Sequence, residues 1–558
     1  MLPLMATTAE KTLYSFPDGP GPDAVEWPGT PIGARNTITR TKGRTKVHDK
    51  TIDRKPGLLT RLLANALQAL VTDRREAHSH DVVIHGIRVR AVTNSEHLIS
   101  YWRDNWYAID EWERATGQSV ADSPQVLTIA LGAVPTESEA AYYSRANNMV
   151  VFFNTSYYGQ LKSWVLGAVG RYLASEYGVH SIHGAVVEKD GKGILYIAPT
   201  GTGKSTSSYG VMAFPKTRFH SDDWVYIRYA YRTKDGRLIS PIRVEQQERE
   251  VARGYQCYGW IESHRGAKAV IHGRGLDDKA ITVPATEIDL SQPTEAYAYT
   301  SEKVFYLRAN LVENFPVAAF DIIKSRLENA PDVSAEFMAQ SRGTIAAVVA
   351  ALRADPHFSG SVFERMSEAE LQTTVARLFA FDNARAMLDI TTVFPSDRVY
   401  TNPMQPCRIT TVMLLKRNFG EDVVAKRLTI DEFMARLMVG LTPMGTKEIV
   451  YNSYRAVDDV SERKWLDTLE AEGTDKMWRL YLEARDKPET LQEEFELFRM
   501  LFQSAKAFDV NTIIQKDPRV GSKMEAVSRT MRLIETLHAS DDEKLTATIA
   551  DYAQYLGR

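Results

Sequence analysis

A glycine-rich segment of the chain carries the residue types that bind phosphate. It reads Ala198-Pro199-Thr200-Gly201-Thr202-Gly203-Lys204-Ser205-Thr206. Glycines let the backbone turn successive N–H groups toward phosphate oxygens, and a helix that begins there adds partial positive charge. Lys204 would reach the β- and γ-phosphates, and the Ser205 hydroxyl would ligate Mg²⁺. The segment from Pro199 to Thr206 is therefore predicted to bind a nucleoside triphosphate.

The flanks of this segment favour a phosphate-binding loop over a chance glycine-rich turn. Residues 194–197 form a short apolar run that predicts a strand, and residues 207–212 can open a helix. Strand, loop and helix follow in the order that a P-loop requires. Ala198 replaces the usual first glycine, but that position serves mainly the turn, and the phosphate-facing half is intact.

Two adjacent carboxylates, Asp222 and Asp223, follow the loop just ahead of the strand-like run 225–227. Beside a bound triphosphate, one carboxylate can complete the Mg²⁺ shell and the other can accept a proton from an attacking hydroxyl. The residues alone do not decide which aspartate has which role. The alternative is a solvated Asp-Asp turn.

A histidine precedes the loop. His183 lies in the apolar run 181–187, which predicts a strand joined to the loop strand by the turn 189–193. Folding this hairpin brings His183 near the mouth of the loop, where it could ligate metal or polarise phosphate. A purely structural histidine is the alternative.

Hydrophobic periodicity around these residues predicts the elements that position them. Helices are expected over residues 58–70 and 160–176. Strands are expected over residues 82–92, 126–131, 149–153 and 409–415. Later helices are expected over residues 430–439, 462–472, 476–484, 491–505 and 524–537. The predicted fold class is α/β, with a P-loop core, a mixed β-sheet and a helical C-terminal region.

The same pattern predicts four regions along the chain. They are a flexible, basic arm over residues 1–55, an α/β domain over 56–155, a nucleotide-binding domain over 156–420 and a helical region over 421–558.

Composition bounds the remaining possibilities. The chain has 558 residues, of which 44% are hydrophobic and 25% charged, which is typical of a folded globular protein. A net charge of -3 does not indicate nucleic acid, and two cysteines are too few for a disulfide framework. No apolar run approaches the ~18 residues that cross a bilayer, and the start of the chain lacks a secretory pattern. A cytoplasmic protein with no membrane partner is expected.

Together these residues resemble the superfamily of phosphoenolpyruvate carboxykinases and HPr kinase/phosphorylases. In HPr kinases a His-Gly strand precedes the loop as His183 does here, and an Asp-Asp pair follows it. In ATP-dependent carboxykinases a Tyr-x-Gly-Glu-x-Lys segment is similar to Tyr157-Tyr158-Gly159-Gln160-Leu161-Lys162. His183 falls on their metal-binding histidine, and residues 303–310 are similar to a later strand. The resemblance covers about residues 157–320.

The resemblance implies a carboxykinase-like P-loop core that uses ATP and Mg²⁺, with Mn²⁺ as the alternative ion. It also implies that Lys162 and Arg308 contact substrate. The chain departs from both branches at specific positions. Ser163 replaces a carboxykinase metal-binding lysine, residues 185–187 replace the carboxykinase Ser-Ala-Asn, and Thr206 stands where HPr kinases usually have Glu.

The leading hypothesis is a kinase that transfers a phosphoryl group from ATP to a hydroxyl of a small molecule or protein. An arginine would steady the transition state, and Arg243, Arg308 and Arg417 are the candidates. One alternative is carboxykinase chemistry, which interconverts oxaloacetate and phosphoenolpyruvate. A second is a nucleotide-gated binding protein without catalysis, in which the helical C-terminal region holds a partner.

Overall fold

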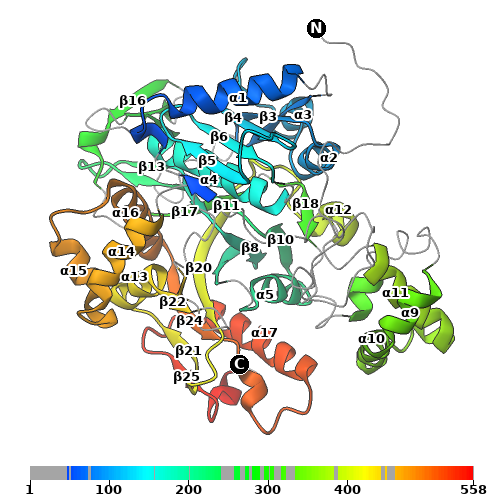
Figure 1. The fold of residues 1–558 in the computed structure, drawn as a ribbon. Coiled ribbons are helices and arrows are strands. Elements are labelled where there is room, and N and C mark those ends of the chain that lie inside the picture. The colour runs from blue at the N-terminus through cyan, green and yellow to red at the C-terminus, as the bar shows by residue number, and fades with distance from the viewer. Residues whose placement is uncertain are drawn as a thin grey trace. The chain divides into compact units, whose positions relative to one another are not determined.

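The computed structural model describes the chain between residues 47 and 556, with gaps. Outside the description lie residues 1–46, 50–51, 73–76, 156–157, 200–201, 241–256, 264–269, 276–278, 290–293, 301, 307–315, 322–332, 382–386, 442–446, 449–458 and 557–558. The chain divides into two compact units, whose helices and strands are labelled in Figure 1. Unit 1 comprises residues 1–169 and 323–387, and unit 2 comprises residues 170–322 and 388–558.

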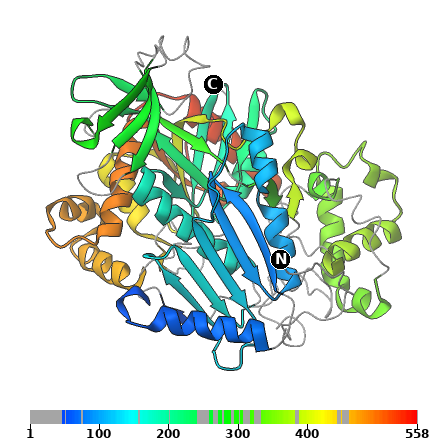
Figure 2. The same ribbon diagram turned by 90° about the horizontal axis from the view of Figure 1, so that it is seen from above.

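Unit 1 contains a six-stranded mixed sheet with strand order β1-β5-β6-β4-β3-β2, whose longer strands lie side by side in Figure 2. The strands are β1 Val47–Asp49, β2 His78–Ile84, β3 Ile87–Thr93, β4 Val126–Leu131, β5 Ala140–Ser144 and β6 Met149–Phe153. Its helices are α1 Leu58–Thr72, α2 Glu96–Asn105, α3 Ile109–Thr116, α9 Ala335–Gln340, α10 Arg342–Ala354 and α11 Glu368–Phe381. Helix α4, Tyr158–Tyr177, runs from the stretch assigned to unit 1 into that assigned to unit 2.

The strand expected over residues 82–92 is two strands of a hairpin. The chain turns at His85 and Gly86, which have φ angles of 49° and 81°. Alternate residues of β3 are buried, as its period-two pattern predicts. The outward-facing Arg88 and Arg90 both bond the Asp81 carboxylate on β2, which lowers the pKa of that carboxyl. The apolar alternation continues through the turn, and this continuity concealed the hairpin.

Unit 2 is built on a ten-stranded sheet. Its main path is β10-β8-β9-β20-β17-β11-β7, and β24 adds β21 and β25 beside β20. The strands are β7 His180–Ile182, β8 Gly184–Lys189, β9 Lys192–Ile197, β10 Thr217–Ser221, β11 Val225–Tyr229, β17 Ala296–Tyr299, β20 Cys407–Lys416, β21 Val423–Arg427, β24 Lys506–Asn511 and β25 Thr546–Thr548. The neighbouring helices α5 Lys204–Val211 and α17 Lys523–Ala539 pack against each other.

A second sheet of unit 2 has five strands in sequence order. They are β12 Tyr231–Arg232, β13 Leu238–Ser240, β14 Cys257–Ser263, β15 Val270–Gly275 and β16 Ala280–Pro284. The remaining elements are β18 Val304–Tyr306, β19 Met387–Asp389, α12 Ile390–Val393, α13 Ile430–Met438, β22 Gly440–Leu441, β23 Lys447–Glu448, α14 Asp459–Glu470, α15 Met477–Glu483 and α16 Glu489–Ser504.

Residues after 420 are less helical than expected. Helices α13 to α17 lie where the periodicity predicts them, but β21, β24 and β25 join the central sheet of unit 2. Strand β24 pairs in parallel with β20, and its residues from Ala507 to Asn511 are buried. A strand this short between two amphipathic helices has too few residues for a clear alternating pattern. The expected boundary at residue 420 therefore falls inside unit 2.

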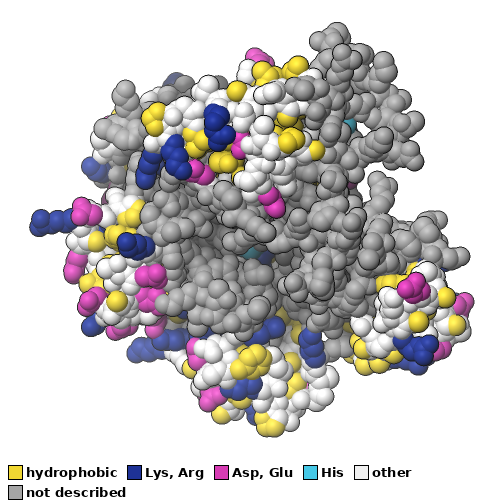
Figure 3. Space-filling view, viewed as in Figure 1, with side chains coloured by type: hydrophobic (Ala, Val, Ile, Leu, Met, Phe, Trp, Pro, Cys, Tyr) yellow, Lys and Arg dark blue, Asp and Glu magenta, His cyan; other side chains and the backbone are white. Residues whose placement is uncertain are grey.

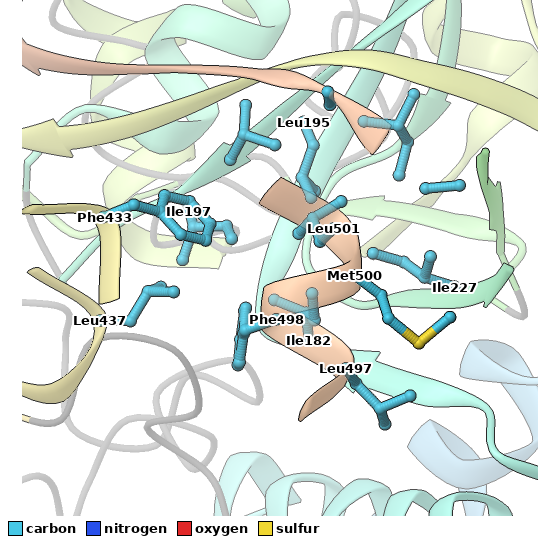
Figure 4. Packing of buried hydrophobic residues seen from close by; sticks show 14 of the residues in the cluster. Ile182, Leu195, Ile197, Ile227, Phe433, Leu437, Leu497, Phe498, Met500 and Leu501 are labelled. Atoms are coloured by element: carbon cyan, nitrogen blue, oxygen red, sulfur yellow. The ribbon is translucent and has the colours of Figure 1, made fainter. Parts of the chain in front are cut away.

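An apolar core holds the central sheet of unit 2 against two helices (Figure 4). The sheet contributes Ile182, Leu195, Ile197 and Ile227, helix α13 contributes Phe433 and Leu437, and helix α16 contributes Leu497, Phe498, Met500 and Leu501. Burying one such side chain contributes roughly 1.5–3 kcal/mol. This packing fixes strands β9 and β11, and with them the ends of the polar segments that follow β9 and precede β11.

The described part of the chain carries both charged and apolar side chains on the face shown in Figure 3. Its large exposed hydrophobic residues are Leu67, Val71, Phe419 and Leu482. None of the helices in the described ranges combines the length and apolar character that crossing a membrane requires.

We expect unit 2 to lose stability below pH 6.5 because it contains buried neutral histidines. Burial lowers the pKa of His180 to about 3 and that of His538 to about 4, against an ordinary value of 6.5. Between these values and pH 6.5 the unfolded chain binds protons that the folded chain excludes. Stability is therefore complete above pH 6.5 and falls by about 1.4 kcal/mol per pH unit for each histidine as the pH drops.

Denaturant unfolding between pH 7.5 and 4.5 measures this effect. His538→Gln is a suitable variant because Nδ1 of His538 lies 2.8 Å from the Thr411 hydroxyl, a contact that an amide can replace. Its stability should fall less steeply with decreasing pH than that of the wild type. Parallel slopes would show that His538 already titrates normally in the folded state.

Candidate phosphate-binding site

The strand predicted before the glycine-rich segment and the helix predicted after it are both present in unit 2. Strand β9 ends at Ile197 and helix α5 begins at Lys204. Thr202 is linked back to the residues just after the strand, because its hydroxyl donates to the Pro199 carbonyl at 2.8 Å. Gly203 is the N-cap of α5 with φ 107° and ψ 16°, a backbone conformation that favours glycine. The loop therefore leads directly into a helix N-terminus.

Lys204, Ser205 and Thr206 form the first turn of α5 and are all buried. The Lys204 ammonium donates to the Asp222 carbonyl at 2.7 Å and lies 3.4 Å from Oδ1 of Asp223. The acid pair that follows the loop in sequence is thus beside the lysine in space. Thr200 and Gly201 lie outside the described residues.

Paired strand breaks bring His183 to the same place. His183 is the residue between β7 and β8, and Asp222 to Trp224 lie between β10 and β11. Strand β7 pairs with β11, and β8 pairs with β10, so the two breaks lie next to each other. As a result, Nε2 of His183 lies 3.4 Å from Oδ1 of Asp223. The strand expected over residues 181–187 is interrupted, and the interruption places the histidine.

Trp224 supports this arrangement from one side. Its ring stacks on the His183 ring with 6.0 Å between centroids and an interplanar angle of 28°. The indole Nε1 donates to the Ser181 hydroxyl at 2.6 Å. Because the ring is fully buried and bonded, it limits rotation of the histidine beside Asp223.

The two aspartates have different surroundings. Asp223 Oδ1 lies near both Lys204 and His183. Both carboxylate oxygens of Asp222 are buried and have no hydrogen-bond partner within the described ranges. Burying a carboxylate without a partner is costly, and a bound cation removes that cost. The difference indicates that Asp222 is the better cation ligand of the pair.

Within the described ranges, Asp222 does not belong to a cluster of metal-binding side chains. Among the described residues, His, Cys, Asp and Glu side chains do not gather in groups of three that could hold a metal ion. Mg²⁺ is commonly held by one or two carboxylates together with substrate phosphates and water. The Ser205 hydroxyl and the Asp222 carboxylate are groups of the types that supply the protein ligands in such a shell.

Of the other candidate residues, Arg417 is the one that the described part of unit 2 places next to the loop. Lys162 is buried on α4, in the stretch assigned to unit 1. Arg308 and Arg243 lie outside the described residues. Arg417 follows β20 close to the loop, because a Cβ placed on Gly203 would lie 3.9 Å from its Nη2.

Thr512 is a residue of the site that sequence reasoning missed. Its hydroxyl donates to the Thr202 carbonyl of the loop at 2.9 Å. The residue follows β24, and a polar Asn-Thr pair at the end of a buried strand was the available signal.

Gly203→Ala tests whether this backbone matters for phosphate binding. At φ 107° an alanine is expected to cost about 1 kcal/mol of stability. It should also weaken MgATP binding, because the new methyl group and a shifted backbone disturb the loop amides. Calorimetry of MgATP binding measures the second effect.

Gly191→Ala is the matched control for this substitution. Gly191 has φ 76° in the β8–β9 turn, with nothing within 4 Å of an added Cβ. It should cost similar stability and leave MgATP affinity unchanged. Equal effects of the two variants on affinity would rule out a specific role for Gly203.

Neither a protein-family model nor a curated protein sequence matches this chain.

Proposed function

We propose that the chain is an ATP- and Mg²⁺-dependent kinase that transfers the γ-phosphoryl group to a hydroxyl of a small molecule or protein. The observation that carries this proposal is the meeting of Lys204, Asp222, Asp223 and His183 beside a helix N-terminus. Residues from three separate sequence segments converge there. Their chemistry matches the requirements of phosphoryl transfer, which depends on positioning and on neutralising charge.

The contacts described above support a role for each of these residues. The loop amides and the Lys204 ammonium would bind the β- and γ-phosphates, with the ammonium turning from Asp223 toward the nucleotide. Ser205 and Asp222 would ligate Mg²⁺. Asp223 would accept the proton of the acceptor hydroxyl, and His183 would orient that carboxylate through the 3.4 Å contact.

In the proposed transfer step, the acceptor oxygen forms a bond to the γ-phosphorus, and the bond between that phosphorus and the β,γ-bridging oxygen breaks. The acceptor proton passes to Asp223, and the electron pair of the broken bond stays on ADP. Lys204 would offset the charge that develops on the leaving oxygen, and Mg²⁺ held by Ser205 and Asp222 would add positive charge there.

Carboxykinase chemistry is the second candidate, and the closeness of His183 to Asp223 favours it. A histidine nitrogen and a carboxylate at one place could hold a transition metal such as Mn²⁺. Ser163 stands where the carboxykinases have a further metal-binding lysine, which favours the kinase. Mn²⁺-dependent decarboxylation of oxaloacetate with ATP would identify carboxykinase activity.

An ADP-release assay against a panel of hydroxyl-bearing metabolites and proteins tests the proposal. We expect at least one acceptor to stimulate ADP release and to be recovered in phosphorylated form. Nucleotide binding with no stimulation by any acceptor, together with partner affinity that depends on the nucleotide, would instead support a nucleotide-gated binding protein.

A further inference from the structure

We infer that Arg417 contacts the terminal phosphate of the bound nucleotide, and that Thr512 is a positioning residue for both Arg417 and the phosphate loop. This inference rests on the proposed function. It adds an arginine that distinguishes a triphosphate from a diphosphate, and it gives the C-terminal strand β24 a role at the site.

Strand order places Arg417 at the loop. Strand β20 pairs in parallel with β9, with Leu414 opposite Ile197. The carboxyl ends of parallel neighbours meet at one edge of a sheet, so the residues after Lys416 emerge beside the loop that follows β9. The contact distance agrees, since a Cβ on Gly203 would lie 3.9 Å from Arg417 Nη2.

Thr512 links the arginine to the loop. Strand β24 pairs in parallel with the other edge of β20, with Asn511 opposite Lys416. The Thr512 hydroxyl accepts from Arg417 Nε at 3.2 Å and lies 2.9 Å from the Thr202 carbonyl. The Lys416 carbonyl, 3.1 Å from the Thr512 hydroxyl, is a second acceptor within reach of its single proton. Of the two carbonyls, that of Thr202 lies nearer to the hydroxyl.

Hydrogen bonds between neighbouring residues stabilise the contacts among Arg417, Thr512 and Thr202. Asn511 and Asn418 exchange two hydrogen bonds, from the Asn418 N–H to Oδ1 of Asn511 at 2.8 Å and from Nδ2 of Asn511 to the Asn418 carbonyl at 2.9 Å. These bonds join the chain on both sides of the Arg417–Thr512 contact. Since Thr512 is only 8% exposed, its hydroxyl is positioned by the fold and screened from solvent.

The chemistry of the guanidinium group indicates which part of the ligand Arg417 contacts. Arginine carries a permanent charge and a planar set of donors that matches phosphate oxygens. Its Nη2 lies near Gly203, which directly precedes Lys204 in the sequence, and Lys204 is expected to reach the β- and γ-phosphates. The γ-phosphate is the group whose charge is redistributed during transfer, so an arginine there can assist turnover as well as binding.

Arg417→Lys and Arg417→Gln test the contact by calorimetry with MgATP and MgADP and by ADP release with the acceptor. MgATP affinity should fall by about tenfold or more and MgADP affinity should change little, since one charged hydrogen bond is lost only with the triphosphate. The turnover number should fall by roughly 10³-fold. Arg408→Lys, on the strand β20 that precedes Arg417 and ion-paired with Glu295, is the control and should match the wild type.

Thr512→Val and Thr512→Ser separate positioning from packing. Valine keeps the shape and removes the hydroxyl, so it should reproduce the MgATP-specific loss, whereas serine should restore wild-type discrimination between MgATP and MgADP. An unchanged ratio of the two affinities in Arg417→Gln, or in Thr512→Val, would overturn the inference. The kinase proposal fails separately, if Lys204→Ala still binds MgATP as the wild type does.

Discussion

Asp222→Asn is expected to abolish turnover and, at the same time, to stabilise the nucleotide-free protein. Both Asp222 carboxylate oxygens are buried without a hydrogen-bond partner in the described part of the chain. Replacing a buried unpartnered charge with a neutral amide should raise the free energy of unfolding by roughly 1 kcal/mol. The same change removes the proposed Mg²⁺ ligand. Function and stability are therefore expected to change in opposite directions.

Three measurements check this prediction: denaturant unfolding, Mg²⁺-dependent ATP binding and ADP release. Asp235→Asn is a suitable control because Asp235 is exposed and bonded to Thr233 and Arg237. It should be slightly destabilised and retain full activity. If Asp222→Asn lowered stability while leaving the Mg²⁺ dependence of ATP binding intact, Asp222 would be a structural residue and not a cation ligand.

Asp223→Asn is expected to separate nucleotide binding from turnover. Asp223 contacts Lys204 and His183 and is the proposed proton acceptor. Removing a general base typically lowers the turnover number by about 10²–10⁴-fold. MgATP affinity should change much less, because Asn keeps the shape and Lys204 is still present to bind phosphate. Unlike Asp222→Asn, this variant should lose stability, since it breaks buried contacts to two side chains.

Steady-state kinetics and calorimetry on the same preparation measure the two effects. His183→Gln should give a smaller loss, because His183 acts only by orienting the carboxylate. Wild-type turnover in Asp223→Asn would contradict the assignment of the base.

The local parts of the site could be predicted from sequence because each depends on a short, continuous pattern. The apolar strand before the loop, the glycines and the Lys204-Ser205 pair occupy one segment. A hairpin turn connects His183 to that segment, so the sequence could predict that it lies near the loop, although not the strand break that sets it beside Asp223. The helices α13 to α17 were predictable because a 3.6-residue period persists over several turns.

The parts that escaped prediction depend on residues far apart in sequence. Thr512 reaches the loop only because β24 pairs with β20 and β20 pairs with β9. No local pattern encodes that strand order. Likewise, residues 323–387 belong to unit 1 although unit 2 residues precede and follow them. A composition pattern along the chain does not reveal that the chain leaves one unit and later returns to it.

The different surroundings of the Asp222 and Asp223 carboxylates could also be seen only in the structure and not in the sequence. The two residues are identical in type and adjacent in sequence, so sequence left the metal ligand and the base interchangeable. The break between β10 and β11 directs one carboxylate toward Lys204 and His183 and leaves the other without a partner within the described residues. Their backbone placement produces the division of roles proposed above.

Calorimetric titration of MgATP into the wild type and into Lys204→Ala most directly tests whether the backbone around Lys204 holds a nucleotide. Saturable binding by the wild type is predicted, with affinity at least about tenfold weaker in the variant because a buried charged donor to phosphate is lost. Circular dichroism should show the two proteins equally folded. Absence of binding heat in the wild type across several temperatures, or equal affinities in the two proteins, would contradict the account.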